Sequence, residues 1–362
     1  MTERIRWGII GAGNIANSFA NDLPHTETGV LAAIASRTLD RANAFAAGHP
    51  SCQVFGNYQE MVNSDAVDAI YVATPNSLHC EHALLAIEAG KPVLVEKPLA
   101  TSATEAEKIA DAAQSHGVFC MEALWTRFLP TMVEIRNKVT GGELGPIRQL
   151  HVSLGFPRIA RAGDPITDPA LGGGALTDLG VYGVTIAHYL LGASTCISAA
   201  VTHNDLGSAR EATILLQHGN AEDAPLSIIS VSHGTELSNT LSVFGADGKV
   251  WTDAPLIQSR RAWQSRVHAT DPSQSAQQPS GMKARLQKTR LWPAIRQIGK
   301  AVVTSGHKRF GAGFPGTGLH FQADEVGRCL RNGRYQSELM PLDQSVAVIR
   351  QLDDVRRLTG ND

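Results

Sequence analysis

RIRWGIIGAGNIANSFANDL, residues 4–23, is the stretch that decides the fold. Its apolar first third predicts a buried strand, and its amphipathic second half predicts a helix. Between them, Gly11 permits a tight turn, Gly13 lets the backbone approach a pyrophosphate, and Ala16 keeps the helix close to the sheet. The pattern G-x-G-x-x-A also occurs in purely structural turns, but between a strand and a helix it indicates a phosphate cradle. We therefore predict a dinucleotide site that includes Gly11, Ala12, Gly13, Asn14 and Ile15.

The composition indicates a globular enzyme with room for two cores. Hydrophobic residues make up 43% and charged residues 18% of 362 residues. The formal net charge of -2 argues against nucleic acid as a partner. Five scattered cysteines, an odd number, do not suit a disulfide framework and favour a cytoplasmic location. We expect no signal peptide and no membrane contact, because no run of about 18 apolar residues offers a span.

Strand and helix patterns alternate through residues 1–124, which predicts βαβ units and a parallel sheet. The expected strands are 4–10, 30–35, 68–73, 92–95 and 118–122, and the expected helices are 14–23, 39–47, 79–89 and 104–116, the last closed by Gly117. We interpret this segment as an N-terminal Rossmann domain. Ligand groups should gather at the carboxyl ends of its strands.

The pattern changes over residues 125–362, which we assign to a second α/β domain. The expected elements are alternating apolar residues over 150–156, one helix over 174–191, strands at 196–203, 212–218, 226–233, 240–244 and 249–253, a hairpin turn at 245–248 and a final helix over 342–358. Strands in succession without intervening helices predict a large, mostly antiparallel open sheet. Helices cover one face of such a sheet, and solvent or a second subunit must cover the other.

Residues 258–310 form a basic inserted segment with eleven Lys or Arg and one acidic residue. An apolar stripe over 291–302 suggests a helix within it. We interpret the segment as an inserted loop and helix with a solvated basic face. Contact with a polyanion or membrane surface, or lining of the substrate cleft, are the alternatives.

The end of the second predicted strand indicates which nicotinamide cofactor binds. An NAD site usually has Asp or Glu there, whereas this strand ends in Ser36-Arg37. Arg37 can pair with a 2′-phosphate and stack on adenine, and Ser36 adds a hydroxyl donor. A solvated arginine is the simpler interpretation. We favour NADP, with NAD possible.

Glu96-Lys97-Pro98 follows a predicted strand, where a catalytic group belongs. Repulsion from the cofactor's positive ring, together with desolvation, should lower the pKa of Lys97. An ordinary surface lysine is the alternative. A second cluster is GGGALTDLGVY, residues 172–182, in which Asp178 and Tyr182 share one helical face. They form a plausible proton relay, in which Lys97 lowers the pKa of Tyr182. Alternatively, the helix dipole favours an aspartate such as Asp178 in the first helical turn, and Tyr182 is a packed side chain.

Several histidines and one arginine rank lower as site residues. His79-Cys80-x-His82 has poor geometry for a shared metal ion, and we expect no metal site. His151, Arg158 and His320 are weaker candidates for substrate contact.

Four segments resemble the glucose–fructose oxidoreductase/inositol dehydrogenase (Gfo/Idh/MocA) superfamily. They are GIIGAGNIA (8–16), ATPNSLHCEHALLAIEAGKPVLVEKP (73–98), MEALWTRFLP (121–130) and GGGALTDLGVYGVTIAHYLLG (172–192). The chain looks most like the dihydrodiol and sugar dehydrogenase branch, although many family members carry histidine where Tyr182 stands. Residues 319–326 resemble the start of the family's late helix.

The resemblance implies roles for individual residues. Lys97 would be the catalytic lysine, with a cis peptide bond to Pro98, and Asp178 and Tyr182 would face substrate. Thr74, Pro75, Asn76 and His79 would line the nicotinamide side, and Trp125 and Arg127 would lie near the nicotinamide and substrate. Glu96 and Lys97 complete the expected cofactor-binding residues. Family members dimerise or tetramerise through the open sheet, so the resemblance also implies a homodimer or homotetramer.

The combined expectation is an NADP-dependent oxidoreductase. It would transfer a hydride between nicotinamide C4 and a carbinol carbon of a sugar, polyol or cyclic diol. Three alternatives stay open: a cofactor-binding regulator or scaffold without turnover, a hydrolase or lyase that uses NAD as a transient oxidant, and an imine-reducing relative.

Overall fold

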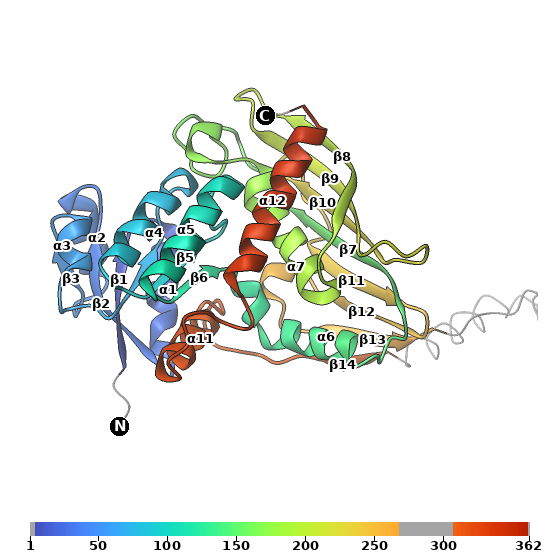
Figure 1. The fold of residues 1–362 in the computed structure, drawn as a ribbon, viewed down its shortest axis with the longest axis horizontal. Coiled ribbons are helices and arrows are strands. Elements are labelled where there is room, and N and C mark those ends of the chain that lie inside the picture. Colours follow the sequence, from blue (N-terminus) through green and yellow to red (C-terminus); the bar gives the residue numbers. More distant parts are fainter. Residues whose placement is uncertain (1–3, 268–306, 361–362) are drawn as a thin grey trace, which may run out of the picture.

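The computed structural model describes residues 4–267 and 307–360, which contain two β-sheets with their helices (Figure 1). The first sheet is parallel and has six strands in the order β3-β2-β1-β4-β5-β6. The strands are β1 (Ile5–Ile10), β2 (Gly29–Ala35), β3 (Gln53–Phe55), β4 (Ala69–Val72), β5 (Val93–Glu96) and β6 (Cys120–Ala123). The strand order reverses between β1 and β4, which opens a ligand crevice at their carboxyl ends. The predicted Rossmann fold is confirmed.

Helices cover both faces of the first sheet. They are α1 (Asn14–Asp22), α2 (Leu39–Ala47), α3 (Tyr58–Val62), α4 (His79–Glu88) and α5 (Ala103–His116). The Ser102 hydroxyl caps α5 by accepting a hydrogen bond from the Glu105 amide, and Gly117 ends it with a left-handed φ of 62°. The sequence patterns missed β3 and α3, which are short.

The second sheet has eight strands in the order β14-β13-β12-β11-β7-β10-β9-β8. The strands are β7 (Ile147–Gly155), β8 (Thr195–His203), β9 (Ala209–Gln217), β10 (Leu226–Ser232), β11 (Thr240–Gly245), β12 (Gly248–Thr252), β13 (Ala262–Arg266) and β14 (Lys308–Phe310). All neighbouring pairs are antiparallel except β7 and β10, which are parallel. The mostly antiparallel open sheet is therefore confirmed, as is the hairpin between β11 and β12.

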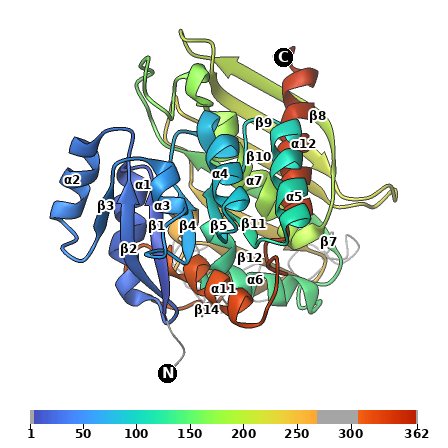
Figure 2. The ribbon, with the colours of Figure 1, turned by 60° about the vertical axis from the view of Figure 1, so that its left-hand side comes forward.

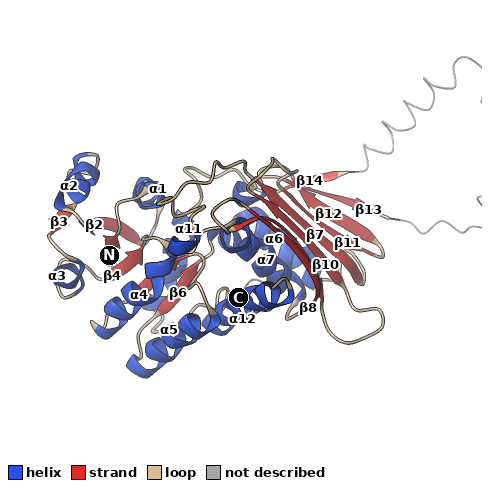
Figure 3. Cartoon of the chain, turned by 90° about the horizontal axis from the view of Figure 1, so that it is seen from above, coloured by secondary structure: helices blue, strands red, loops and turns tan. Residues whose placement is uncertain are grey.

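Helices lie on one face of this second sheet and leave the other open (Figure 3). The covering helices are α6 (Pro130–Thr140), α7 (Val181–Leu191) and α12 (Leu342–Leu358). The buried side chains of Leu150, Val152 and Leu154 on β7 face them. Helix α12 also packs beside α5 of the first unit (Figure 2). The described part of the basic segment includes the whole of β13 and β14. The apolar stripe expected at 291–302 lies outside the described residues.

A buried carboxylate ties α11 (His320–Arg331) to the first unit. Asp22, at the end of α1, is 2% exposed and accepts hydrogen bonds from the amides of Thr317, Gly318 and Leu319 at 2.8–3.1 Å. Burial alone would raise the pKa of Asp22, but hydrogen bonds from His320 and Thr317 hold it well below its ordinary value. The segment 317–319, which lies 295 to 297 positions away in the sequence, is thus anchored on one ionised group.

We expect Asp22→Asn to lower the free energy of unfolding by about 2–4 kcal/mol, because it weakens several buried hydrogen bonds to one charge. A lowered pKa in the folded state means that the contribution of Asp22 is complete above the unfolded carboxyl pKa. It is then lost as the pH falls through the folded pKa. Thermal unfolding at pH 7 and at acidic pH measures this. Asp65→Asn, at an exposed position, is the control, and equal stability of both variants at pH 7 would contradict the assignment.

Candidate active site

The glycine turn after β1 is shaped to admit an anion. Gly11 has a φ of 103°, and a Cβ there would lie 2.6 Å from the Ala73 carbonyl oxygen. A Cβ on Gly13 would meet nothing within 4 Å, so the backbone is open to an approaching ligand. Helix α1 begins at Asn14 without a side-chain cap, which leaves its first amides free for an anion. Ala12 and Ile15 are half-buried around this opening. These features fit a dinucleotide pyrophosphate.

At the tip of β2, Ser36 is buried and Arg37 is exposed. Asp40 lies on α2, one turn beyond the tip. The geometry therefore leaves a guanidinium, and no carboxylate, directly after the strand. This arrangement fits a 2′-phosphate better than a free 2′-hydroxyl.

The ammonium of Lys97 meets the second predicted cluster across the gap between the two sheets. Its Nζ donates to the Asp178 carbonyl oxygen at 2.9 Å and to the Asp178 carboxylate. The same ammonium lies 4.9 Å from the ring centroid of Tyr182. His233, at the end of β10, places Nε2 3.1 Å from the other Asp178 carboxylate oxygen. The Lys97-Pro98 peptide bond is cis, as expected.

The helix that carries Asp178 and Tyr182 begins differently from the prediction. Residues Leu176–Gly180 form a π turn, and α7 starts only at Val181. π turns recur at functional sites because they widen the helix locally. Here the carbonyl of Asp178 within the π turn accepts the Lys97 hydrogen bond.

The Tyr182 hydroxyl has a defined orientation. It accepts a hydrogen bond from the Trp125 indole nitrogen at 2.9 Å, so its own proton is available for another partner. Beside it, Glu96 accepts a hydrogen bond from the Tyr71 hydroxyl and another from the Lys97 amide at 3.1 Å. Glu96 is 5% exposed and holds the backbone of Lys97 through this second hydrogen bond.

We expected lowered pKa values for Lys97 and Tyr182, but the groups around them in the folded protein raise both. Burial alone would lower the pKa of Lys97, but Asp178 and Tyr182 together raise it above its ordinary value. For Tyr182, burial raises the pKa to about 12, and the opposing effect of Lys97 is smaller. The expectation failed because it left out the pairing with Asp178 and the depth of burial. By contrast, burial raises the pKa of Glu96 to about 7 despite its Tyr71 hydrogen bond.

The loop after β4 and the start of α4 contain four of the residues expected to line the cofactor. Thr74, Pro75 and Asn76 are half-buried, and the Asn76 amide donates to the Gly172 carbonyl at 2.9 Å. His79 is fully buried, with Nδ1 2.7 Å from the Pro98 carbonyl oxygen and Nε2 3.0 Å from that of Thr74. Burial lowers its pKa to about 4. His79 therefore joins the Thr74 and Pro98 loops, and its contact with the cofactor stays a prediction.

Arg127 also has partners within the fold. It is 2% exposed, and its guanidinium donates to Gln344 at 2.7 Å and lies over the Tyr189 ring. These partners belong to α12 and α7, so Arg127 joins these helices, and its place near the nicotinamide and substrate stays a prediction. Trp125 does lie at the site, through its bond to Tyr182.

The weaker candidates separate clearly. Arg158 lines a pocket together with His233. His151 lies on the open face of the second sheet, beside Phe244, and His320 is buried against Asp22. Both expected substrate contacts are therefore corrected. Among the described residues, no three His, Cys, Asp or Glu side chains gather as for a metal ion.

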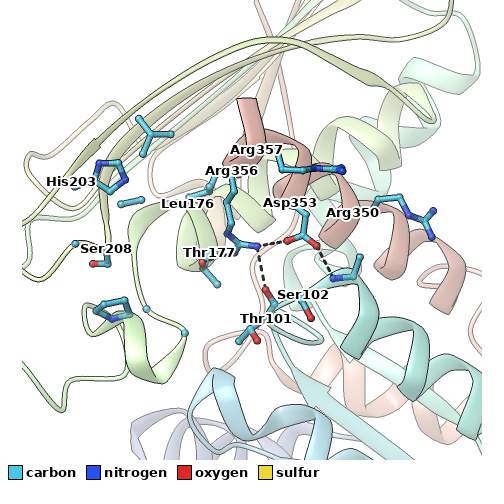
Figure 4. Close-up of a pocket in the computed structure, with 17 residues that line it drawn as sticks. Thr101, Ser102, Leu176, Thr177, His203, Ser208, Arg350, Asp353, Arg356 and Arg357 are labelled. Carbon is cyan, nitrogen blue, oxygen red and sulfur yellow. Dashed lines mark hydrogen bonds and ion pairs between the residues drawn. The ribbon is translucent and has the colours of Figure 1, made fainter. Parts of the chain in front are cut away.

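Three supporting residues were not found from the sequence. Tyr71 and His233 sit in stretches without a motif. Arg356 on α12 donates to the Thr101 carbonyl at 3.2 Å and the Thr177 hydroxyl at 3.1 Å, and it pairs with Asp353. All four of these residues line a pocket of about 820 Å³ (Figure 4). Arg356 thereby ties the segment after Lys97 to the residue before Asp178.

The fold and the glycine cradle define a class, the oxidoreductases with a nucleotide-binding Rossmann domain. Residues 5–124 match the family described as "Oxidoreductase family, NAD-binding Rossmann fold", and residues 132–251 match the "GFO/IDH/MocA C-terminal domain". The chain belongs to this family, and the protein is an oxidoreductase.

Individual relatives match nearly the whole chain. Trans-1,2-dihydrobenzene-1,2-diol dehydrogenase of Bos taurus is 31% identical, covering 98% of this chain and 97% of the relative. D-xylose 1-dehydrogenase (NADP(+)) of Hypocrea jecorina is 28% identical, covering 98% and 92%. The solved structure of KijD10, a 3-ketoreductase from Actinomadura kijaniata in complex with NADP and TDP-benzene, has a TM-score of 0.78 at 23% identity, covering 99% of this chain and 98% of that chain. At that identity, the likeness supports the fold.

No helix within residues 4–267 and 307–360 has both the length and the apolar character of a membrane span.

Proposed function

We propose that the protein is an NADP-dependent oxidoreductase acting on a carbinol carbon of a sugar, polyol or cyclic diol. The observation that carries the proposal is the convergence of Lys97, Asp178 and Tyr182 at the carboxyl edge of a sheet whose first turn is a glycine cradle. NADP, when bound, supplies or accepts a hydride at its nicotinamide C4. The relatives named as diol and xylose dehydrogenases support this substrate class.

The chain's own residues divide the proton and charge chemistry. In its deprotonated form, Tyr182 takes the substrate hydroxyl proton during oxidation, and as the neutral phenol it returns that proton during reduction. Lys97 remains an ammonium, since its pKa is raised, and stabilises negative charge developing on the substrate oxygen. Asp178 holds Lys97 in place, and His233 holds Asp178. Lys97 is thus an electrostatic group rather than the base.

The direct test is turnover. Purified protein is incubated with NADP and a panel of aldoses, polyols and cyclic diols, and NADPH formation is followed by absorbance. The proposal expects net NADPH formation with at least one substrate. Tight NADP binding without reduction would favour the regulator alternative, and substrate conversion without net NADPH would favour transient oxidation.

We expect Arg37→Ala to weaken NADP binding by about 10- to 100-fold, because it removes charged hydrogen bonds to the 2′-phosphate. NAD binding should change by less than about threefold. Titration calorimetry with both cofactors measures this, and Arg331→Ala at an exposed position is the control. Equal losses for NADP and NAD would contradict the role of Arg37.

We further propose a homodimer or homotetramer through the open face of the second sheet. A half-buried row crosses this face: Trp263, Trp251, Ser242, His151, Ile228 and Leu215 are successive cross-strand neighbours. Such an apolar and aromatic row on an uncovered face favours a partner over solvent.

Ile228→Glu should convert the oligomer to a monomer, because it places a charge in that row. Light scattering after gel filtration measures the mass, and Leu358→Glu at an exposed position is the control. A monomeric wild type would contradict this proposal.

We also propose a cytoplasmic location, which the five free cysteines support.

A further inference from the structure

A pocket of about 310 Å³ opens beside the catalytic cluster, where β7, β9 and β10 end or begin. We call it the arginine pocket, because its lining includes Arg158 and Arg210, together with Asp205, His203 and His233. Its volume lies within the range of small-molecule sites, roughly 300–1,000 Å³. No role proposed above uses its arginines.

The arginine pocket is joined to the catalytic residues through His233. One ring nitrogen of His233 lies 3.1 Å from Asp178, while its Nδ1 is buried and has no hydrogen-bond partner among the described residues. The backbone holds both arginines beside this histidine. The Arg158 amide donates to the His233 carbonyl at 2.8 Å, and the His233 amide donates to the Arg210 carbonyl at 2.8 Å.

Both guanidiniums are free to bind a ligand. Within the residues that the structure describes, the side chains of Arg158 and Arg210 make no hydrogen bond and no ion pair, and both residues are exposed. The arginines of the larger pocket differ: Arg350, Arg356 and Arg357 each pair with a carboxylate. Two arginines that line one pocket without an ion pair can form a recognition site for a carboxylate or phosphate.

The arginine pocket also contains one carboxylate. Asp205 lines it without an ion pair to either arginine in the described part of the chain. An ionised carboxylate accepts hydrogen bonds, so it suits the hydroxyl groups of a polyol. Two positive groups and one acceptor together match a ligand that carries both an anionic group and hydroxyls.

We infer that the substrate is a polyhydroxy compound with an anionic group, such as a sugar acid or a sugar phosphate, whose anion binds Arg158 and Arg210. This inference rests on the proposed function and narrows its substrate class. The carbinol carbon would face the Lys97 cluster while the charged end occupies the arginine pocket.

The experiment compares matched substrates that differ only in the anion. D-glucose, D-glucuronate and D-glucose 6-phosphate are assayed with NADP, and so are D-galactose and D-galacturonate. The wild type is compared with Arg158→Gln/Arg210→Gln and with the control Arg161→Gln, an exposed arginine outside the pocket lining. Calorimetric titration of the same compounds onto the protein with NADP measures binding independently of turnover.

We expect the wild type to prefer an anionic member of a pair by about tenfold or more in kcat/KM, the equivalent of one charged hydrogen bond. The double variant should lose that preference while its activity on the neutral sugar stays within threefold, and Arg161→Gln should keep it. The compound with the higher kcat/KM, either the carboxylate or the phosphate, identifies the preferred anion. Turnover of neutral sugars without anion preference, or a preference that survives in the double variant, would overturn the inference alone. Absence of turnover and of calorimetric binding for every compound would overturn it together with the proposed function.

Discussion

Replacing Lys97 with methionine should lower kcat by about three orders of magnitude, with NADP affinity nearly unchanged. The ammonium is half-buried, hydrogen-bonded to Asp178 and 4.9 Å from the Tyr182 ring centroid. Methionine keeps the length of the side chain and removes the charge that would stabilise the substrate oxygen. Steady-state kinetics in both directions measure the loss, with Lys108→Met on the exposed side of α5 as the control.

Loss of Lys97 also leaves the half-buried Asp178 carboxylate with His233 alone. Breaking a fully buried pair commonly costs about 3–5 kcal/mol, and partial exposure makes the cost here smaller. The double variant Lys97→Met/Asp178→Asn separates the two effects, because it removes both charges. We expect it to recover much of the thermal stability while kcat stays low. A single variant that retains more than a third of wild-type kcat would exclude Lys97 from the chemistry.

Replacing Tyr182 with phenylalanine should lower kcat by about 10²- to 10⁴-fold, the usual contribution of a positioned acid or base. The hydroxyl already accepts the Trp125 indole proton at 2.9 Å, so the phenol proton is directed to another acceptor, which we propose is the substrate oxygen. Tyr189→Phe is a matched control on the same helix. The Tyr189 ring lies against the guanidiniums of Arg127 and Arg136 instead of the Lys97 cluster. Equal activity of Tyr182→Phe and Tyr189→Phe would refute the assignment.

The pH dependence follows from the same environment. Because burial raises the pKa of Tyr182 to about 12, the phenol stays protonated at neutral and moderately alkaline pH. Reduction should therefore show no loss of rate from Tyr182 between about pH 7 and 10. Oxidation needs the deprotonated Tyr182 oxygen as the proton acceptor. Its rate should therefore increase as the pH rises through this range. Initial rates in both directions across the range test the pair of expectations.

Features set by neighbours along the chain were predictable from sequence. The glycine turn, the alternation of strands and helices, and the guanidinium after β2 all depend on residues within one supersecondary unit. Their physical causes are local, namely backbone freedom at Gly11, apolar periodicity and the free amides at the start of α1. Lys97, Asp178 and Tyr182 were predicted as candidates because each stands at the end of a strand or in the first turns of a helix.

Properties that depend on groups far apart in the sequence were decided only by the tertiary structure. Lys97 and Asp178 are 81 positions apart, and Asp178 and His233 are 55 apart, so no local pattern could pair them. That pairing reversed the expected pKa shift of Lys97, since a pKa responds to burial and to the nearest charge rather than to the residues beside it in sequence. His79 and Arg127 carry the family pattern, and only the packing of the chain shows that both are buried with partners far away in the sequence. Local sequence thus determined which chemical groups are available, and packing determined which of them meet, because only the folded chain sets distance and exposure.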